Sequence, residues 1–287
     1  MSNIGLFRDS EGNVHTGRDV TEALKRVGAQ DCALLFIHTD INFGAPVPGI
    51  KRREYLDALY QAILDAGVDT IAFPAFTYSF CNGEDYDVRN SRTSMGALIE
   101  HVRKKPEARR SLDPLLSTIA IGKQSDIFDG DLGHHSLGPE SAFGRLHRME
   151  DAKFLFFGAD FSEYFTYIHY IEKILDVPYR FDKAFTGKIT DYAGNTYPDT
   201  HYIHTQCGGV KLRNFMNLRK DITAKGLLQE TRLGDSEVTC VREKDIYREV
   251  IAALERDINS FLQEPYTEEQ LTKEYTFGKN GERVTHC

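Results

Sequence analysis

The chain has 287 residues, of which 41% are hydrophobic and 27% are charged, close to the averages of globular proteins. This length and composition exclude a disulfide-framed miniprotein and a largely disordered chain, and they favour one large domain. The 35 lysines and arginines against 43 aspartates and glutamates give a formal net charge of −8. This acidic balance argues against nucleic acid or an anionic membrane surface as a partner.

The compartment can be inferred from targeting signals and cysteines. The sequence shows no basic N-terminal stretch followed by an apolar segment and no uninterrupted apolar window of membrane-spanning length, so we expect a cytoplasmic protein without membrane contact. The five cysteines form no C-x-x-C pair, and we therefore expect free thiols instead of disulfides or a zinc ribbon. They are Cys32, Cys81, Cys207, Cys240 and Cys287.

The first part of the chain predicts a strand, a helix and a second strand. Apolar spacing predicts a short helix over Arg18–Val27 and a longer amphipathic helix over Arg52–Ala66,. The apolar runs Ala33–Ile37 and Thr70–Phe73 have the length of buried strands,. Together these segments predict a βαβ unit, in which ligands usually lie at the carboxyl ends of the strands.

The second part of the chain predicts a strand over Phe154–Phe157 and a helix over Phe165–Leu175,. Turn signals at Gly194-Asn195 and Gly234-Asp235 separate short β-like segments,. A final amphipathic helix is predicted over Glu243–Leu262,.

No repeat or low-complexity linker divides the chain. We therefore predict one α/β domain over residues 1–263, followed by a polar and loosely ordered tail over residues 264–287,. Because many cytoplasmic enzymes are symmetric oligomers, a homodimer is expected.

Polar residues follow the first predicted strand as His38-Thr39-Asp40. Hydroxyl and backbone N–H groups at such a strand end can hold a phosphate, which Asp40 would oppose. An H-x-D sequence after a strand is also typical of metal-dependent hydrolases, and a plain polar strand exit is the third interpretation.

Two further segments have the composition of ligand-binding loops. Phe73–Tyr78 offers an aromatic wall at a strand end, although, taken alone, packing at the edge of the core is the favoured explanation,. Arg109–Pro114 follows the basic stretch His101–Lys105, and arginines beside a serine-rich turn can bind phosphate in a bidentate manner,. A solvated charged face is the alternative.

The predicted helix after residue 164 carries Thr166-x-x-His169-x-x-Glu172. Spacings of three place His169 and Glu172 on neighbouring turns, where a neutral imidazole could take a proton from an attacking amine. The adjacent His134 and His135 are interpreted as a loop pair and not as a metal site, because neighbours point apart and no third ligand has a suitable spacing,.

Five motifs follow one another between residues 16 and 260: Phe36-Ile37-His38-Thr39 with Gly44, Phe73-Pro74-Ala75-Phe76-Thr77, Arg110-Ser111-x-x-Pro114-x-x-Ser117, Ser141-Ala142-Phe143-Gly144-Arg145-Leu146, and Thr166-x-x-His169-x-x-Glu172. Their order resembles the aminoglycoside 3-N-acetyltransferase family. The resemblance implies an α/β fold distinct from that of the GNAT acetyltransferases. It has a mixed central sheet, flanking helices and a small additional β-rich C-terminal portion.

The resemblance also implies an acyltransferase that uses acetyl-CoA as co-substrate and no metal. Its substrate would be the amine of an aminoglycoside or of another amino sugar, including a nucleotide-linked one. His169 would be the general base for direct attack on the thioester, and Glu172 would contact the base or the amine. The cofactor candidates are His38, Thr39, Gly44, Pro74, Ala75, Phe76, Thr77, Arg110 and Ser111. The substrate-binding candidates are Asp40, Asp113 and Thr166.

The chain departs from the family pattern at Asp40, Asp113 and Ala142, where the family usually has a small hydroxyl residue, a histidine and a proline. Two other functions are therefore kept beside the acetyltransferase. One is a metal-dependent hydrolase that uses His38 and Asp40. The other is a non-catalytic protein that binds acyl-CoA or a sugar.

Overall fold

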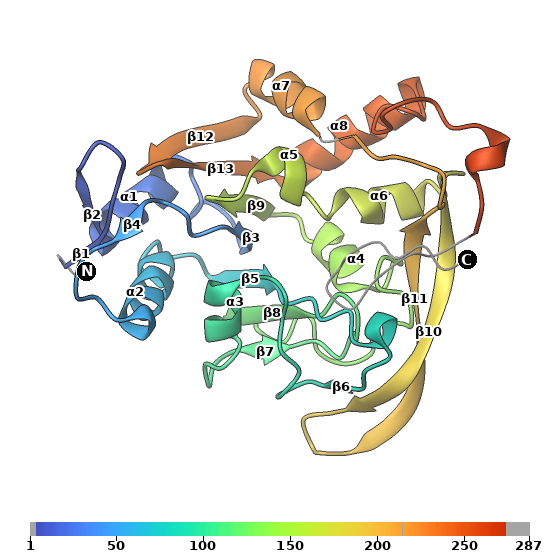
Figure 1. The fold of residues 1–287 in the computed structure, drawn as a ribbon, viewed down its shortest axis with the longest axis horizontal. Coiled ribbons are helices and arrows are strands. Elements are labelled where there is room, and N and C mark those ends of the chain that lie inside the picture. Colours follow the sequence, from blue (N-terminus) through green and yellow to red (C-terminus); the bar gives the residue numbers. More distant parts are fainter. Residues whose placement is uncertain (1–3, 214, 274–287) are drawn as a thin grey trace.

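The computed structural model describes residues 4–213 and 215–273. Its centre is a seven-stranded mixed sheet in the order β12-β13-β9-β3-β5-β8-β7, seen across the middle of Figure 1. The strands are β3 (Leu34–Thr39), β5 (Thr70–Pro74), β7 (Arg109–Arg110), β8 (Thr118–Gly122), β9 (Ala152–Phe157), β12 (Leu228–Leu233) and β13 (Ser236–Arg242).

Strand β3 is the middle of the sheet and runs parallel to both of its neighbours, β5 and β9. The outer strands β8 and β13 run antiparallel to them. Alternate residues of β3 enter two separate cores. Leu34 and Phe36 belong to one core, and Leu35 and Ile37 belong to the other. The central strands are therefore buried on both faces, which explains their continuous apolar sequence.

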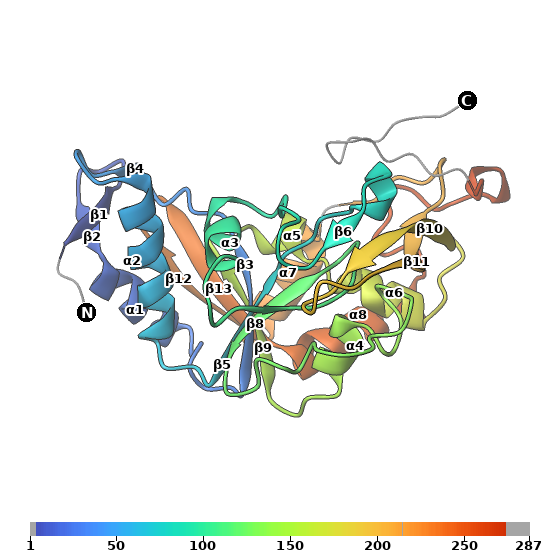
Figure 2. The same ribbon diagram turned by 90° about the horizontal axis from the view of Figure 1, so that it is seen from below.

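Helices cover both faces of the sheet, giving the three layers seen in Figure 2. One face carries α1 (Gly17–Arg26), α2 (Arg52–Leu64) and α3 (Ala97–Val102). The other face carries α4 (Ala142–His147), α5 (Phe161–Tyr164), α6 (Ile168–Ile174), α7 (Met216–Ala224) and α8 (Glu243–Arg256). Helix α1 begins at the N-cap Thr16, whose side chain accepts a hydrogen bond from the backbone N–H of Asp19,.

Two small sheets complete the fold. One joins β1 (Gly5–Arg8), β2 (Val14–Thr16) and β4 (Ala45–Pro46). The other is a long antiparallel hairpin of β10 (Arg180–Thr190) and β11 (Thr196–Gln206), extended by β6 (Tyr86–Asp87). This hairpin is the curved yellow ribbon of Figure 1. Two short 3-10 helices, η1 (Phe80–Asn82) and η2 (Glu268–Gln270), lie in loops.

The predicted βαβ unit is confirmed as β3, α2 and β5, and the predicted strand before Gly158 is confirmed as β9. The helix predicted over Phe165–Leu175 starts later, at Ile168, because the chain turns between α5 and α6. The helix predicted over Glu243–Leu262 ends at Arg256. The segments flanking Gly194 are eleven-residue strands and not short ones.

The first residues of the predicted tail pack against the domain. The Tyr266 ring lies 6.1 Å from that of Tyr179, and the backbone N–H of Gly208 donates to the Thr272 carbonyl. The rest of the predicted tail, with Cys287, lies outside the described residues. No disulfide joins the four cysteines of the described part. None of its helices has the length and apolar character needed to cross a membrane.

Candidate active site

His169 and Glu172 meet on one face of α6, as their spacing predicts. Nδ1 of His169 lies 2.7 Å from Oε2 of Glu172. The Glu172 side chain is almost fully buried, whereas 25% of the His169 side chain is exposed. The helix therefore holds a buried carboxylate behind a histidine that solvent or a ligand can reach.

Two residues at the start of the β10–β11 hairpin complete the surroundings of Glu172. Nε of Arg180 forms an ion pair with Oε2 of Glu172 at 2.6 Å, and the Tyr179 hydroxyl donates to Oε1 at 2.9 Å. Sequence reasoning missed both residues, because they lie in a segment without a recognisable motif. They reach Glu172 only because the chain turns back after α6, and no local pattern in the sequence marks that contact.

The charge state of this cluster follows from burial and from the neighbouring charges. Burial, the strongest single influence on Glu172, favours its neutral form, but the Arg180 charge and the bonds from His169 and Tyr179 outweigh it and lower the pKa of Glu172 to about 2. Burial, and next the Arg180 charge, lower the pKa of His169 despite the carboxylate beside it. Near neutral pH the pair is thus a carboxylate and a neutral imidazole.

Nδ1 of His169 has a second close neighbour, Nη2 of Arg180 at 2.8 Å. One nitrogen cannot both accept a proton from Arg180 and donate one to Glu172. Because Glu172 is ionised and can only accept, the tautomer with a proton on Nδ1 fits the carboxylate. That tautomer leaves the lone pair on Nε2, which is the arrangement that a general base requires.

A second ionic network fixes the hairpin to the helix that carries His169. Lys173 of α6 donates to Oδ2 of Asp182 at 2.6 Å. Oδ1 of the same carboxylate lies 3.0 Å from His135 and 2.8 Å from His204. These contacts hold the start of β10 against α6, and with it Arg180.

Thr166, a substrate-binding candidate, lies one turn before His169. Its carbonyl accepts the backbone N–H of His169 at 3.0 Å, and its side chain is partly exposed. The structure therefore brings His169 and Glu172 into contact and joins Thr166, just before α6, to His169 through the backbone.

The candidate His38 lies inside the core. It is 4% exposed, and its ring is stacked on Phe156 at 5.1 Å between centroids. Burial lowers the pKa of His38 to about 3, so the ring is neutral, and Nε2 has no hydrogen-bond partner among the described residues. The His38 side chain therefore packs in the core and does not point into the loop that follows β3.

Thr39 and Asp40 are partly exposed at the carboxyl end of β3. Two close backbone approaches shape this strand end. A Cβ atom added at Gly44 would lie 2.3 Å from the Arg8 carbonyl oxygen, and a Cβ atom added at Gly158 would lie 1.9 Å from the Asp40 carbonyl oxygen. Both positions therefore require glycine, and a packing contact with β1 already explains Gly44.

The predicted aromatic wall is buried. Pro74, Ala75, Phe76 and Thr77 all lie in the interior at the end of β5. The Thr77 hydroxyl donates to the Pro114 carbonyl at 2.8 Å. The segment therefore shapes the strand end mainly through its backbone and its packing.

Arg110 holds loops together with its whole guanidinium group. Nη1 donates to the Ser91 carbonyl at 2.6 Å, Nη2 to the Ala75 carbonyl at 2.7 Å and Nε to the Ser117 hydroxyl at 3.1 Å. The group is 2% exposed and lies 5.3 Å from the centre of the Tyr86 ring. These contacts make Arg110 a positioning residue for the loop after β5, and it also lines a cavity.

Ser111 and Asp113 face inward in the same way. The Ser111 hydroxyl accepts the backbone N–H of Thr118 at 3.0 Å. Oδ1 of Asp113 accepts the backbone N–H of Leu115 and the hydroxyl of Ser136, both at 2.8 Å. Asp113 also lines a cavity beside the β10–β11 hairpin, so it is the one of these two that reaches a space where a ligand could bind.

The basic stretch and the arginines of the third motif converge on one cavity. The cations that line it are Arg89, Arg103, Lys104, Lys105, Arg109 and Arg110. Glu100 pairs with Arg103 and with Lys104, at 2.7 and 3.1 Å. Asp57 pairs with Lys105. The cations outnumber the carboxylates that pair with them, and the cavity is therefore positively charged.

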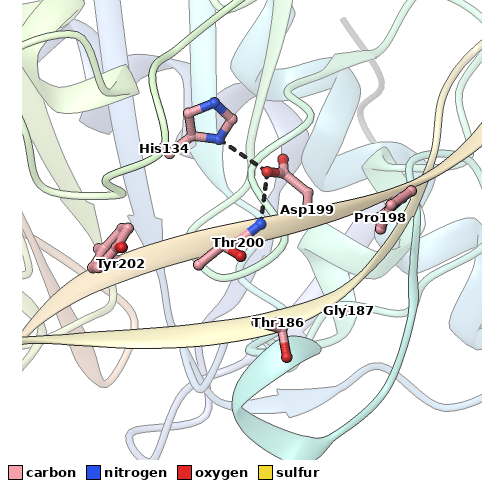
Figure 3. Close-up of a pocket in the computed structure, with 7 residues that line it drawn as sticks. All are labelled: His134, Thr186, Gly187, Pro198, Asp199, Thr200 and Tyr202. Carbon is pink, nitrogen blue, oxygen red and sulfur yellow. Dashed lines mark hydrogen bonds and ion pairs between the residues drawn. The ribbon is translucent and has the colours of Figure 1, made fainter.

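Another cavity lies beside the hairpin (Figure 3). Its lining residues are His134, Thr186, Gly187, Pro198, Asp199, Thr200 and Tyr202. By contrast, no group of metal ligands surrounds His38 and Asp40 within the residues that the structure describes. The hydrolase interpretation therefore lacks its metal centre at those positions.

The sequence is similar to those of known acetyltransferases. Proteins named aminoglycoside N(3)-acetyltransferase III, from Salmonella sp and from Enterobacter cloacae, are each 28% identical to the chain over 184 residues. The aligned region is 58% of this chain and 63% of each relative. The chain thus spans less than two thirds of the length of these relatives.

Solved structures resemble the fold over most of the chain. Aminoglycoside acetyltransferase AAC(3)-IIb has a TM-score of 0.71 at 20% identity, over 85% of this chain and 97% of that one. AAC-IIIb in a binary complex with CoASH has a TM-score of 0.69 at 19% identity, over 88% and 99%. The YokD protein of Bacillus subtilis has a TM-score of 0.67 at 21% identity, over 85% and 94%. The mixed central sheet with flanking helices is thereby confirmed.

The family model described as aminoglycoside 3-N-acetyltransferase matches residues 36–255. This match includes the helix that carries His169 and Glu172, as well as Tyr179 and Arg180. The chain therefore belongs to the aminoglycoside 3-N-acetyltransferase family.

Proposed function

We propose that the chain is an N-acetyltransferase that moves an acetyl group from acetyl-CoA to the amine of an aminoglycoside or of a related amino sugar, including a nucleotide-linked one. The observation that carries the proposal is the pair of buried Glu172 and partly exposed His169 at 2.7 Å. Family membership supports the reaction class. Among similar folds, AAC-IIIb forms a binary complex with CoASH and a mutant of AAC(3)-IVa forms a complex with apramycin.

The proposed chemistry is a direct transfer. The amine attacks the thioester carbonyl carbon, so a C–N bond forms while the C–S bond breaks. Nε2 of His169 takes the proton from the attacking nitrogen and passes it to the departing thiolate. Glu172 holds the proton on Nδ1 and stabilises the imidazolium that forms transiently, as a carboxylate behind a catalytic histidine does.

Arg180 favours an ionised Glu172 and an unprotonated His169 near neutral pH. Its charge holds Glu172 ionised and disfavours a proton on His169 before the amine arrives. The base is therefore unprotonated when the substrate binds, which is the state that can accept a proton.

For acetyl-CoA, we propose a path along the ends of β3 and β5. The partly exposed Thr39, together with Gly44, lies at one strand end, and Pro74, Ala75, Phe76 and Thr77 form the wall at the other. The cationic cavity beside Lys104 and Arg109 suits the phosphates of the cofactor,. Arg110, Ser111 and His38 act here by shaping the loops and the core.

For the amine substrate, we propose contacts with acidic groups. Asp113 lines a cavity of about 370 Å³, together with Asp131 and Asp199. Such carboxylates attract the protonated amines of an amino sugar. Asp40 and Thr166 remain candidates for the same role, and a homodimer and a cytoplasmic location remain predictions.

Calorimetric titration with acetyl-CoA tests the cofactor before any acceptor has to be known. We expect one site per chain, followed by thiol release when the acceptors gentamicin, apramycin and a nucleotide-linked amino sugar are supplied in turn. Binding without thiol release from any amine would favour the non-catalytic binding protein. No binding at millimolar acetyl-CoA would overturn the proposal.

A further inference from the structure

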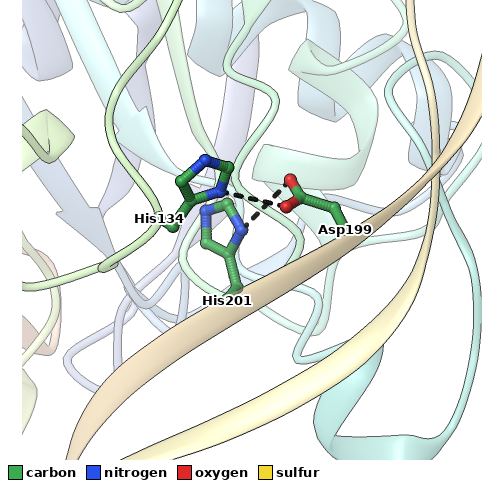
Figure 4. A group of neighbouring side chains, drawn as sticks. All are labelled: His134, Asp199 and His201. Carbon is green, nitrogen blue, oxygen red and sulfur yellow. Dashed lines mark ion pairs between the residues drawn. The ribbon is translucent and has the colours of Figure 1, made fainter.

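Three side chains from two distant parts of the sequence meet at the β10–β11 hairpin. Nδ1 of His134 lies 3.0 Å from Oδ1 of Asp199, and Nδ1 of His201 lies 3.6 Å from Oδ2 of the same carboxylate. Figure 4 shows both imidazoles turned toward Asp199. The donor atoms of the three side chains all lie within 4.8 Å of one another. They form what is called here the His-Asp-His cluster.

The fold explains why the sequence interpretation missed this cluster. His134 and His135 do point to different partners, Asp199 and Asp182. No third ligand has a suitable spacing in the sequence, but the fold brings Asp199 and His201 of β11 beside His134. Asp199 and His201 are separated by two positions on a strand and so share one face of it.

The backbone holds the loop against the strand at this point. The Tyr202 N–H donates to the His134 carbonyl at 2.7 Å, and the Ser136 N–H donates to the Tyr202 carbonyl at 2.9 Å. The His201 ring packs at 6.5 Å, edge to face, against Phe80. The donor atoms are therefore positioned by a rigid strand and by a loop that is fixed to it.

Burial sets this cluster apart from a surface ion pair. His201 is 5% exposed, and its Nδ1 atom has no hydrogen-bond partner among the described residues. The Asp199 side chain is only 14% exposed. A buried nitrogen that is aimed at a carboxylate and has no hydrogen bond is costly unless another group satisfies it. A metal ion between the two would do so.

We propose that the His-Asp-His cluster binds one divalent transition-metal ion of the zinc type. Two imidazole nitrogens and one carboxylate oxygen are a ligand set that zinc prefers. A zinc ion bound at about 2.0–2.1 Å needs donors roughly 3.3 Å apart. The two imidazole nitrogens lie 3.0 and 3.6 Å from different oxygens of Asp199, and the three donor atoms lie within 4.8 Å of one another, so binding requires the side chains to move closer together.

The surroundings leave room for a further ligand. His134 and Asp199 line both of the cavities next to the hairpin, and one of them also contains Asp113 and Asp131. A bound ion would thus have three protein ligands and an open position that water or a small molecule can fill. It would also join the loop before Ser136 to β11. The cluster does not include His169 or Glu172, but Asp199 also lines the cavity proposed above for the amine substrate. Metal binding is therefore measured directly and not through acetyl transfer.

Zinc binding to the full chain tests the proposal, with equilibrium dialysis and elemental analysis as the readout. We expect one zinc per chain with a Kd of about 1 µM or tighter. Cobalt substitution should give the visible absorption of a four-coordinate ion. The variants His134→Ala and Asp199→Asn should each weaken binding by at least about tenfold. His134 is 62% exposed, so its replacement keeps the fold intact.

His15→Ala is the matched control, because His15 also lies beside a single aspartate, Asp9, at 2.9 Å. It should bind zinc like the unchanged chain. Zinc should raise the unfolding temperature of the unchanged chain and of His15→Ala, but not that of His134→Ala. Zinc binding that is weaker than about 100 µM, or that survives both cluster variants unchanged, would overturn the proposal.

Discussion

Nδ1 of His169 and Oε2 of Glu172 are 2.7 Å apart, and Nε of Arg180 lies 2.6 Å from the same oxygen. The histidine thus faces a carboxylate that is already neutralised by an arginine. This arrangement orients the imidazole without pulling a proton onto it, because the arginine charge opposes protonation of the ring,.

Arg180→Gln should move the acid limb of kcat/KM to higher pH, by about one pH unit. A base that has to be unprotonated loses activity as the pH falls through its pKa. The native pKa of His169 lies below its usual value, so native activity persists into mildly acidic solution. Without the arginine charge that pKa rises. Arg180→Lys keeps the positive charge, so the acid limb of its pH profile should lie closer to that of the native protein than the limb of Arg180→Gln does. Identical acid limbs in all three proteins would contradict the electrostatic role.

Glu172→Gln should reduce turnover by about 10²-fold or more and lower the free energy of unfolding by about 3 kcal/mol. The amide removes the carboxylate that orients His169 and leaves Arg180 buried without its counter-charge. Tyr179→Phe removes only the hydrogen bond to Oε1 and should cost about 1 kcal/mol, with most of the turnover kept. Denaturant unfolding and thiol-release kinetics measure both effects. Equal effects of the two substitutions would contradict this account of the pair.

His38→Leu should make the protein less sensitive to acid. The pKa of His38 is about 3 in the folded protein, against an ordinary value of 6.5. Below pH 6.5 His38 is therefore protonated in the unfolded chain but stays neutral in the folded chain. The free energy of unfolding consequently falls as the pH falls toward 3. Between pH 7 and pH 4 this loss is about 3 kcal/mol. Unfolding curves at the two pH values should show a smaller difference in the variant, and an unchanged difference would show that His38 is not the group responsible.

Asp113→Ala should destabilise the loop after β7 by about 2 kcal/mol. Its Oδ1 atom accepts the backbone N–H groups of Leu115 and Leu116 and the hydroxyl of Ser136. Ser136→Ala removes only one of these bonds and should cost about 1 kcal/mol. Thermal unfolding of both variants gives the comparison. A larger loss for Ser136→Ala than for Asp113→Ala would contradict the assignment of Asp113 as the centre of this network.

The central part of the fold could be predicted because local patterns and tertiary packing agree there. The apolar run before His38 and the amphipathic helix that begins at Arg52 have the lengths and periodicities of the elements that they form,. The β-like segments predicted on both sides of Gly234 are confirmed as the paired strands β12 and β13. The edge strand β7 was missed, because it is two charged residues long and its pairing with β8 defines it more than its own composition does,.

The site was predicted where its residues lie on one helix and missed where they come from another element. His169 and Glu172 are three positions apart, a spacing that puts them in contact on any helix. Arg180 and Tyr179 reach the pair only because the chain turns back after α6. Asp199 and His201 reach His134 through the hairpin in the same way. Contacts between distant segments leave no local signal in a single sequence.

The contacts of Arg110 show a further limit of sequence reasoning, although its part in binding the cofactor stays a prediction. An arginine next to a serine suggests an anion site, but the structure directs the guanidinium to Ser91, Ala75 and Ser117. The type of a residue determines which hydrogen bonds its side chain can make. Tertiary packing determines whether those hydrogen bonds go to other residues of the chain or are left for a ligand.

The central claim is that His169 is the base of a direct acetyl transfer, and the variant His169→Ala tests it most directly. Thiol release with a competent amine and calorimetric affinity for acetyl-CoA should be measured on the same protein samples. The account predicts that turnover falls by about 10²–10⁴-fold while the Kd for acetyl-CoA stays within about twofold of the native value. Turnover close to the native level in His169→Ala, with acetyl-CoA still bound, would contradict it.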